Sequence, residues 1–308
     1  MNPRPIIGRF APSPTGALHL GSLCTALASY CHIKSLGGQW LVRIEDVDFE
    51  RCKPDYAVSI LTDLDNLGLH SDGEILFQSK RTDIYDEYLA HLSNITYHCT
   101  CSRKELSALS IPAVSFYDVN IKDLHLAPIY PRLCLHKNLS DNKIRLCLPD
   151  VLTAFFDGIQ GVIWDNPAKS LGDVVVKRQN GMINYMLACT IDDGLQGITH
   201  VMRGLDIMPM TVAQLCIAKA CLLPTPHYFY HLPLLVNHDG QKLSKQNLAT
   251  PIDTTTPDKV SDLLFTALTL LGQNPPAELQ KETPDTILMW ATRHWDNGVL
   301  QGAALGMV

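Results

Sequence analysis

The N-terminal segment IIGRFAPSPTGALHLGS, residues 6–22, constrains the fold more than any other part of the sequence. Its apolar start predicts a short buried strand, which the prolines and glycine of APSPTG interrupt, and a helix is predicted over residues 17–34. A strand that leads directly into a helix places the unpaired amides of the first helical turn at the carboxyl edge of a sheet. Such an edge suits an anionic ligand. The segment therefore predicts an α/β fold with a binding site at this turn.

Predicted strands and helices alternate after this segment. Residues 38–46, GQWLVRIED, predict a second strand, and helices are predicted over residues 54–67 and 81–94. The order strand, helix, strand, helix implies a parallel sheet with right-handed crossovers. Further strands and helices are predicted within residues 173–206, 209–222, 257–271 and 284–295.

The middle of the chain differs from its flanks. Residues 97–149 are less periodic and richer in proline, histidine and cysteine, so we interpret them as an insertion. We therefore expect a catalytic domain in two halves, residues 1–96 and 150–247. A helical region is expected at residues 248–308.

The distribution of cysteines and the hydropathy of the sequence indicate the cellular compartment of the protein. The ten cysteines are scattered, mostly in apolar runs, which favours a reducing cytosol over a disulfide framework. No apolar run approaches the roughly 18 residues of a membrane span, and the N-terminus has no signal-peptide pattern, so we expect a cytoplasmic protein without membrane contact. The net charge of -6 argues against a generally basic nucleic-acid coat but permits a local basic surface.

Two short motifs indicate nucleotide chemistry when taken together. His19 and Gly21 put an imidazole and a bare backbone at the start of the predicted helix, although a purely structural turn would explain them equally well. Lys242 and Lys245 flank a serine in GQKLSK and suit a departing pyrophosphate, although paired loop lysines are usually only solvated charge. The chain contains no G-x-x-x-x-G-K-[ST] and no G-x-G-x-x-G, so the site is not the usual phosphate loop.

The two motifs resemble the signature motifs of class I aminoacyl-tRNA synthetases. GRFAPSPTG, LVRIEDVD and DDGLQGITHVMRGLD are similar to the glutamyl branch, and the likeness runs from Ile6 to about Asn247. Full-length glutamyl enzymes continue with a large helical anticodon-binding region, which we do not expect here. Gln246 replaces their usual arginine, and RGLD replaces their RGEEW. The chain is therefore similar to the glutamyl-queuosine tRNA(Asp) synthetase family.

This resemblance implies a fold and a reaction. The fold is a class I Rossmann-type α/β catalytic domain with a small inserted zinc-bearing subdomain and a helical C-terminal stem region. The reaction is the ATP- and Mg²⁺-dependent, tRNA-independent activation of L-glutamate to glutamyl-adenylate. The glutamyl group then passes to the queuosine at the wobble position of tRNA(Asp). The partner is the anticodon stem-loop that carries this base, and a monomer is expected.

The resemblance also implies the site residues. Glutamate would bind where a carboxylate matches the ammonium group and arginines match the carboxylates, although which arginine takes the side-chain carboxylate stays open. The glutamate set is Arg9, Phe10, Ala11, Pro12, Ser13, Glu45, Tyr185 and Arg203. The catalytic set is His19, Gly21, Lys242 and Lys245, and the ATP set consists of these four with Ser22, Leu243 and Ser244.

A cysteine cluster in the insertion suits a metal. Cys99 and Cys101 lie in one short turn, and a third thiolate could complete a structural zinc site, although reduced thiols in a β-turn are nearly as good an interpretation. The resembled family uses three cysteines and a tyrosine, which implies one Zn²⁺ on Cys99, Cys101, Tyr130 and Cys134. The rivals of Tyr130 are Tyr117, His98, His125 and His136.

Other interpretations remain open. A truncated glutamyl-tRNA synthetase would charge a 3'-terminal ribose, and a catalytically silent derivative would only bind tRNA or zinc. A small nucleotidyltransferase could share the H-x-G turn. Asp192 and Asp193 are interpreted as structural or pocket-shaping. Apolar helical positions predict small core roles for Cys24, Cys31, Cys189, Cys216 and Cys221.

Overall fold

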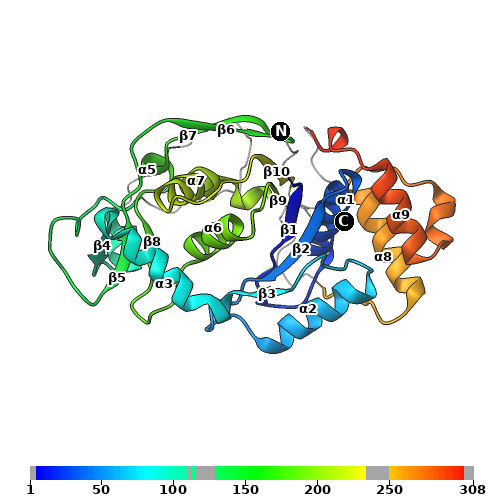
Figure 1. Ribbon diagram of the computed structural model, residues 1–308, viewed down its shortest axis with the longest axis horizontal. Helices are drawn as coiled ribbons and strands as arrows, with labels where there is room; N and C mark the ends of the chain where they lie inside the picture. The colour runs from blue at the N-terminus through cyan, green and yellow to red at the C-terminus, as the bar shows by residue number, and fades with distance from the viewer. Residues whose placement is uncertain (1–4, 110–111, 115–128, 234–249, 302–308) are drawn as a thin grey trace.

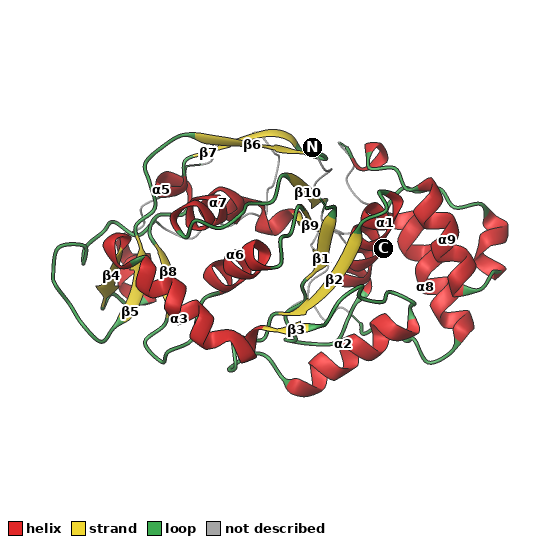
Figure 2. Ribbon diagram, viewed as in Figure 1, coloured by secondary structure: helices red, strands yellow, loops and turns green. Residues whose placement is uncertain are grey.

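The structure is a computed structural model that describes residues 5–109, 112–114, 129–233 and 250–301 of the chain. Figures 1 and 2 show a central sheet with helices on both sides and a smaller sheet at one end of the molecule. The central sheet has seven strands in the order β3-β2-β1-β9-β10-β6-β7. These strands are Leu76–Phe77 (β3), Gln39–Ile44 (β2), Ile7–Phe10 (β1), His200–Gly204 (β9), Tyr228–Leu232 (β10), Thr153–Asp157 (β6) and Gly161–Asp165 (β7).

Parallel pairing dominates the central sheet. The pairs β3–β2, β2–β1, β1–β9, β9–β10 and β10–β6 are parallel, and only the hairpin β6–β7 is antiparallel. The predicted parallel α/β architecture is confirmed. Its carboxyl edge collects the residues that follow β1, β2, β9 and β10, where ligands of open α/β sheets gather.

Helices cover both faces of the sheet. Along β9 the side chains alternate: Met202 packs in one core with helix α1 (Leu20–Ser35), and Val201 packs in another with α7 (Thr211–Ala220). This alternation is the consequence of the two-residue period of a strand. The remaining α-helices are α2 (Pro54–Asn66), α3 (Thr82–His91), α4 (Arg103–Leu109), α5 (Pro167–Ser170), α6 (Tyr185–Leu195), α8 (Pro257–Leu270) and α9 (Pro284–His294).

Helix α1 begins three residues later than the sequence predicted. His19 still has extended dihedral angles and caps the helix, so the turn that starts at Ala11 continues to this residue. The helix then packs between the sheet and the C-terminal helices α8 and α9, at the right of Figure 1. Leu27 of α1 and Leu264 of α8 belong to the same buried core. The C-terminal helices therefore extend the core of the N-terminal half, and the limit predicted at residue 247 stays a prediction.

The smaller sheet has three antiparallel strands in the order β4-β5-β8, Thr96–Cys99, Lys143–Leu146 and Val174–Lys177. The chain leaves this sheet after β5, forms the hairpin β6–β7 in the central sheet, and returns for β8. The third strand of the small sheet therefore follows residue 149, where we expected the insertion to end. The domain limits stay predictions.

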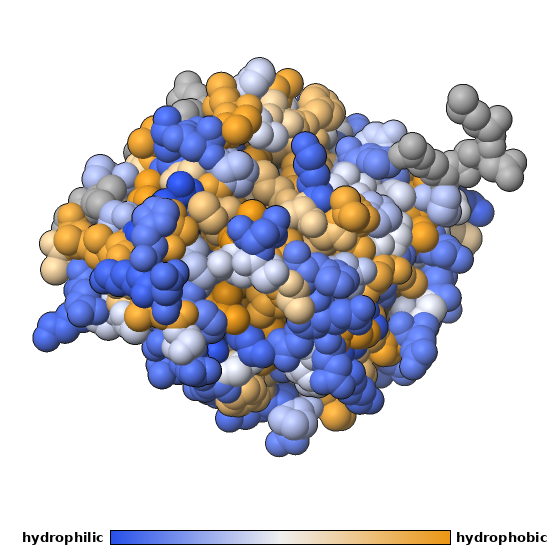
Figure 3. Space-filling model, turned by 60° about the vertical axis from the view of Figure 1, so that its left-hand side comes forward, coloured by the Kyte–Doolittle hydropathy of each residue, from blue (hydrophilic) through white to orange (hydrophobic). Residues whose placement is uncertain are grey.

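The hairpin β6–β7 exposes an apolar face at the edge of the central sheet. Phe156, Val162 and Trp164 are each at least half exposed. Hydrophobic residues also gather along the top of Figure 3, the side on which β6 and β7 lie in Figure 1. None of the described helices combines the length and the apolar character that a membrane span needs.

Candidate active site

The turn after β1 ends in a histidine-capped helix. Nδ1 of His19 accepts a hydrogen bond from the amide of Ser22 at 3.3 Å, and Oγ of Ser22 accepts one from the amide of His19 at 2.8 Å. The acceptor role of Nδ1 places the ring proton of neutral His19 on Nε2. Ser22, which we predicted to bind ATP, uses its hydroxyl in this cap. Gly21 is the second residue of α1.

The chain returns to this turn from a distant segment. Pro251 forms an isolated antiparallel bridge with His19, and the amide of Ile252 donates a hydrogen bond to the carbonyl of Leu18 at 3.0 Å. The predicted residues Lys242, Leu243, Ser244 and Lys245 lie outside the described residues, between Leu232 at the end of β10 and this bridge.

Four buried charged residues, from β1, from β2 and its end, and from α6, form an ion-pair network. Nε and Nη2 of Arg9 contact the two carboxylate oxygens of Asp193 on α6, at 3.1 and 3.4 Å. Nη2 of Arg43 lies 2.8 Å from Asp193 Oδ1 and 3.0 Å from Glu45 Oε1. Each of these residues is less than 7% exposed. Two guanidinium groups thus balance two carboxylates.

The network shifts the pKa values of its two acids in opposite directions. Burial raises the pKa of Asp193, but the charges of Arg9 and Arg43 outweigh burial and lower it to about 2. Burial also raises the pKa of Glu45, and here Arg43 and Arg9 only partly oppose it. Asp193 is therefore the more firmly ionised anion, while Glu45 is the acid that gains most from a further cation.

Cys189 lies inside this network. Its Sγ is 3.4 Å from Nη2 of Arg43 and 3.8 Å from Oδ2 of Asp193, and the residue is fully buried. We predicted a small core residue, but the contacts are polar. Desolvation raises the thiol pKa to about 12, so Cys189 stays protonated.

Neighbouring Asp192 has a structural role. Its carboxylate accepts hydrogen bonds from Gln78, Arg81 and Tyr85 at 2.6 to 2.9 Å, which ties α6 to the segment before and within α3.

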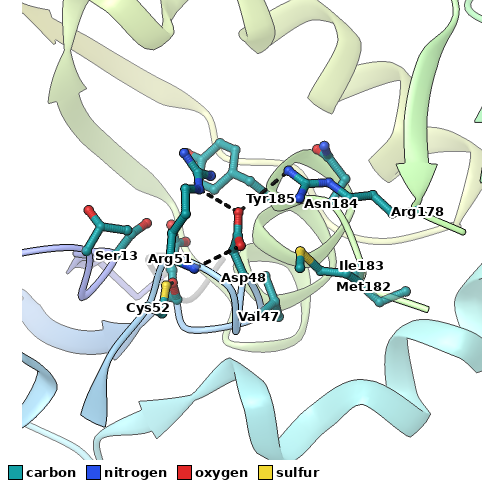
Figure 4. Close-up of a pocket in the computed structure, with 12 residues that line it drawn as sticks. Ser13, Val47, Asp48, Arg51, Cys52, Arg178, Met182, Ile183, Asn184 and Tyr185 are labelled. Atoms are coloured by element: carbon teal, nitrogen blue, oxygen red, sulfur yellow. Dashed lines mark hydrogen bonds and ion pairs between the residues drawn. The ribbon is translucent and has the colours of Figure 1, made fainter. Parts of the chain in front are cut away.

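A cavity of about 70 Å³ opens at the carboxyl edge of the sheet. Three of the residues that we predicted to bind glutamate line it together: Ser13, Glu45 and Tyr185. Figure 4 shows the cavity with Ser13 and Tyr185 labelled. Figure 4 also shows Asp48 between Arg51 and Arg178, and its Oδ2 lies 2.7 Å from Nε of Arg51 and 3.6 Å from Nη2 of Arg178. The other lining residues are Thr15, Val47, Cys52, Met182, Ile183 and Asn184.

The other residues that we predicted to bind glutamate do not line this cavity. Phe10 is buried and stacks on Trp40 with ring centroids 6.3 Å apart. The carbonyl of Pro12 accepts a hydrogen bond from the amide of Glu45 at 3.0 Å, which ties the first turn to the end of β2, and Ala11 precedes it in the same turn. Arg203, at 4% exposure, donates from Nε to His231 and from Nη2 to Thr211, and its Nη1 has no hydrogen-bond partner among the described residues.

A larger basic hollow of about 420 Å³ adjoins the cavity. Arg178 and Asn184 line both. Arg103, Lys143 and Arg145 also line the hollow, and no acidic residue is among the described residues that line it. The hollow therefore suits an anionic ligand larger than an amino acid.

Three cysteines meet beside the small sheet. The sulfur atoms of Cys99, Cys101 and Cys134 all lie within 4.8 Å of one another, and Cys101 and Cys134 are 3.6 Å apart. Tetrahedral zinc with bonds of about 2.3 Å separates two thiolates by about 3.8 Å. The three thiols therefore fit one zinc ion.

The hydroxyl of Tyr130 lies next to this cluster. It is 3.4 Å from Sγ of Cys99 and 3.9 Å from Sγ of Cys101. Nδ1 of His98 instead contacts the backbone of Asn142, while Tyr117 and His125 lie outside the described residues. Among the described residues, no histidine joins the three cysteines as a metal-binding group.

Arg145 is a neighbour of the cluster that sequence reasoning missed. Its Nε donates to Sγ of Cys99 at 3.2 Å, and its guanidinium lies 3.8 Å from the centre of the Tyr130 ring. A cation here would offset part of the negative charge of three thiolates. Sequence reasoning also missed Arg43, although LVRIEDVD contains it.

Comparisons with known proteins show the family of the chain. Residues 5–285 match the family described as tRNA synthetases class I (E and Q), catalytic domain. The chain is 43% identical over 293 residues to a glutamyl-Q tRNA(Asp) synthetase of Acinetobacter baylyi, covering 94% of this chain and 92% of that protein. It is 40% identical over 306 residues to one of Cronobacter sakazakii, covering 99% and 96%.

Solved structures show the same architecture. A glutamate-tRNA synthetase from Elizabethkingia anophelis superposes with a TM-score of 0.73 at 25% identity, covering 97% of this chain and 67% of that chain. A methionyl-tRNA synthetase of Mycobacterium tuberculosis superposes with a TM-score of 0.53 at 9% identity, covering 86% of this chain and 64% of that chain, which shows the fold alone.

Proposed function

Because the chain belongs to the class I tRNA synthetases of the E and Q type and is an ATP-dependent ligase-type enzyme with glutamyl-Q tRNA(Asp) synthetases among its relatives, we propose that it activates L-glutamate without tRNA and transfers the glutamyl group to queuosine in tRNA(Asp). The observation that carries the proposal is the cavity at the carboxyl edge of the sheet. There Ser13, Glu45 and Tyr185 converge, and the turn that contains Ser13 leads to the histidine-capped start of α1.

The cavity and the buried charges suit a zwitterionic amino acid. Glu45 lines the cavity and, with its pKa raised by burial, gains from the ammonium group of a bound substrate. Arg203 does not line this cavity, but its Nη1 is a buried donor that a carboxylate oxygen would satisfy. Charge-assisted hydrogen bonds of this kind contribute about 1.5 to 3 kcal/mol each, or roughly tenfold to hundredfold discrimination against a substrate that lacks the carboxylate.

Activation needs positioning and charge more than acid-base groups. A carboxylate oxygen of glutamate forms a bond to the α-phosphorus of ATP, and the bond from that phosphorus to pyrophosphate breaks. His19, the amides at the start of α1, Lys242 and Lys245 would stabilise the charge on the phosphates. Mg²⁺ would bind through the ATP phosphates. The bridge between His19 and Pro251 supports this grouping, because it joins the segment that follows the lysines to the first turn.

Transfer then uses a hydroxyl of the queuosine ring. Its oxygen forms an ester bond to the glutamyl carbon, AMP leaves, and the hydroxyl proton is released. The basic hollow supports an RNA acceptor, since it adjoins the cavity and lacks acidic lining residues among those described. A tRNA substrate implies a cytoplasmic reaction, and a monomer remains our expectation.

One structural Zn²⁺ would be held by Cys99, Cys101, Cys134 and Tyr130. The supporting observation is the donor set: three thiols at tetrahedral spacing and one phenol oxygen beside them. Bound there, zinc would tie β4 to the segment at residues 130–134 next to the basic hollow, so its role is structural.

The proposal is tested by following labelled glutamate. The protein is incubated with ATP and labelled glutamate, with and without tRNA(Asp) that carries queuosine, and the tRNA is cleaved to locate the label. We expect glutamate-dependent pyrophosphate exchange without tRNA, and label on the anticodon stem-loop only when queuosine is present. Label on the 3'-terminal adenosine of tRNA(Glu) would establish the truncated synthetase instead, and no exchange at all would establish the silent module.

A further inference from the structure

Three polar residues lie side by side on adjacent parallel strands of the central sheet. Arg203 of β9 and His231 of β10 are partners in register, and Asp157 of β6 is the partner of Phe229, two residues before His231. Residues in register, or two apart, lie on one face of a sheet. Asp157, His231 and Arg203 therefore share the face that α7 covers, and they are 0%, 0% and 4% exposed.

Hydrogen bonds decide the protonation of the imidazole. Nε of Arg203 lies 3.0 Å from Nε2 of His231, and a guanidinium can only donate, so Nε2 is an acceptor. The proton of the neutral ring is then on Nδ1, which donates to Oδ2 of Asp157 at 2.6 Å. Desolvation by burial lowers the pKa of His231 to about 4 against the opposing effect of Asp157, so the ring stays neutral at physiological pH.

Asp157 is itself held in place by backbone amides. Its Oδ1 accepts from Ile159 at 3.0 Å and from Gln160 at 2.9 Å, and the amide of His231 contacts both carboxylate oxygens at 3.1 to 3.2 Å. These hydrogen bonds orient the carboxylate, and while it is ionised it can only accept from the ring. This arrangement selects one tautomer of His231.

In the described part of the chain, the guanidinium of Arg203 has partners for two of its three nitrogens. Its Nε is held by His231 and its Nη2 donates to Oγ1 of Thr211 at 2.9 Å, which leaves Nη1 without a partner among the described residues. Both holding groups are neutral, whereas Arg9 is bound directly to the carboxylate of Asp193. Of the buried arginines Arg9, Arg43 and Arg203, Arg203 is thus the one that no carboxylate among the described residues contacts directly.

We propose that Asp157 and His231 are positioning residues, which orient Arg203 so that Nη1 meets a carboxylate oxygen of the amino-acid substrate. The inference rests on the proposed function, because it takes glutamate as that substrate. Asp157 selects the Nδ1–H tautomer, and the Nε2 acceptor then fixes the plane of the guanidinium. The neutral ring does this without neutralising the charge that the substrate requires.

The test compares variants that keep or remove the acceptor of the ring. His231→Gln can present an amide oxygen near the former Nε2, whereas His231→Leu has similar size and no acceptor. In glutamate-dependent pyrophosphate exchange, we expect His231→Leu to raise KM for glutamate roughly tenfold to hundredfold with KM for ATP unchanged, as for the loss of one hydrogen bond to a charged group. His231→Gln should recover most of the loss. His200→Leu is the matched control, a buried histidine on the strand of Arg203, and should leave KM for glutamate unchanged.

A second measurement does not depend on activity. With ¹⁵N-labelled histidine, the nitrogen shifts of His231 should show a neutral Nδ1–H ring in the wild-type protein, and Asp157→Asn should increase the Nε2–H form because the amide can also donate to Nδ1. Wild-type His231 in the Nε2–H form overturns the proposal.

The outcomes separate this inference from the proposed function. If glutamate supports no exchange in the wild-type protein, the proposed function fails, while the tautomer measurement still tests the link between Asp157 and His231. If exchange occurs and Arg203→Ala raises KM for glutamate but His231→Leu does not, the proposed function stands and the positioning role is overturned.

Discussion

Pro251 pairs with His19 in an antiparallel bridge, so the segment after the lysine motif meets the residue that caps α1. Lys245 precedes Pro251 by six residues, which can span at most about 20 Å. Backbone contacts therefore tie the described segment that follows the lysine motif to the turn that contains the first motif.

The first prediction concerns the charge of Lys245. Lys245→Ala should lower the rate of pyrophosphate exchange by about 100-fold or more and weaken ATP binding much less, because its ammonium would act on charge that develops as pyrophosphate departs. Exchange kinetics and ATP titration separate the two effects. Lys259→Ala is the control, since that exposed lysine contacts Asp253 and Thr255 just before α8. Equal losses in rate and in binding would assign Lys245 to ground-state binding.

The second prediction concerns the metal. Protein purified without chelator should contain one zinc per chain, and Cys101→Ser should lose the metal and lower the melting temperature while adenylate formation partly persists. Metal analysis and thermal unfolding measure both effects. Cys216→Ser, at a half-buried cysteine outside the cluster, should retain zinc. Wild-type protein without zinc would refute the site.

The third prediction concerns the buried ion pairs. Asp193→Asn leaves the guanidinium groups of Arg9 and Arg43 without their shared carboxylate and should lower the free energy of unfolding by about 3 to 5 kcal/mol. Urea unfolding gives the value. Asp65→Asn removes an exposed pair with His70 and should cost less than about 1 kcal/mol. Similar losses in the two variants would show that the buried network contributes little to stability.

The fourth prediction concerns acid stability. Burial lowers the pKa of His32, His200 and His231 from 6.5 to about 4, so the unfolded chain takes up protons near pH 6.5 and the folded chain does not until about pH 4. The stability contributed by these groups is therefore complete above pH 6.5 and is lost as pH falls toward 4, at up to about 1.4 kcal/mol per pH unit for each histidine. Urea unfolding between pH 7.5 and 5 should show the decline, and His32→Gln should make it shallower. Constant stability over that range would contradict the burial argument.

The fifth prediction concerns the RNA acceptor. Arg103→Glu should weaken binding of a queuosine-bearing anticodon stem-loop and leave glutamate-dependent pyrophosphate exchange unchanged, because Arg103 lines the basic hollow and not the smaller cavity. Binding measured at several salt concentrations should also show a reduced salt dependence. Arg293→Glu, on the distant helix α9, is the control. Unchanged binding in Arg103→Glu would exclude the hollow as the RNA contact.

Local patterns in the sequence were sufficient for the elements and the family. The apolar run before APSPTG, the capped helices that begin at Pro257 and Pro284, and the paired cysteines at 99 and 101 each carry their signal within a few residues. Propensity, capping and motif spacing are short-range properties, so the parallel α/β architecture and the class I signature follow from them.

Only the tertiary structure decided which charges meet. Arg9 and Asp193 are 184 residues apart in the sequence, and the local pattern around either residue does not show that Arg43 also contacts Asp193. It shows equally little that Arg203 donates its hydrogen bond to a neutral histidine instead. The third strand of the small sheet and the place of Cys189 among guanidinium groups have the same origin. Strand order and register choose these partners, and the low dielectric of the buried site makes that choice strong enough to set charge, tautomer and the direction of a donor.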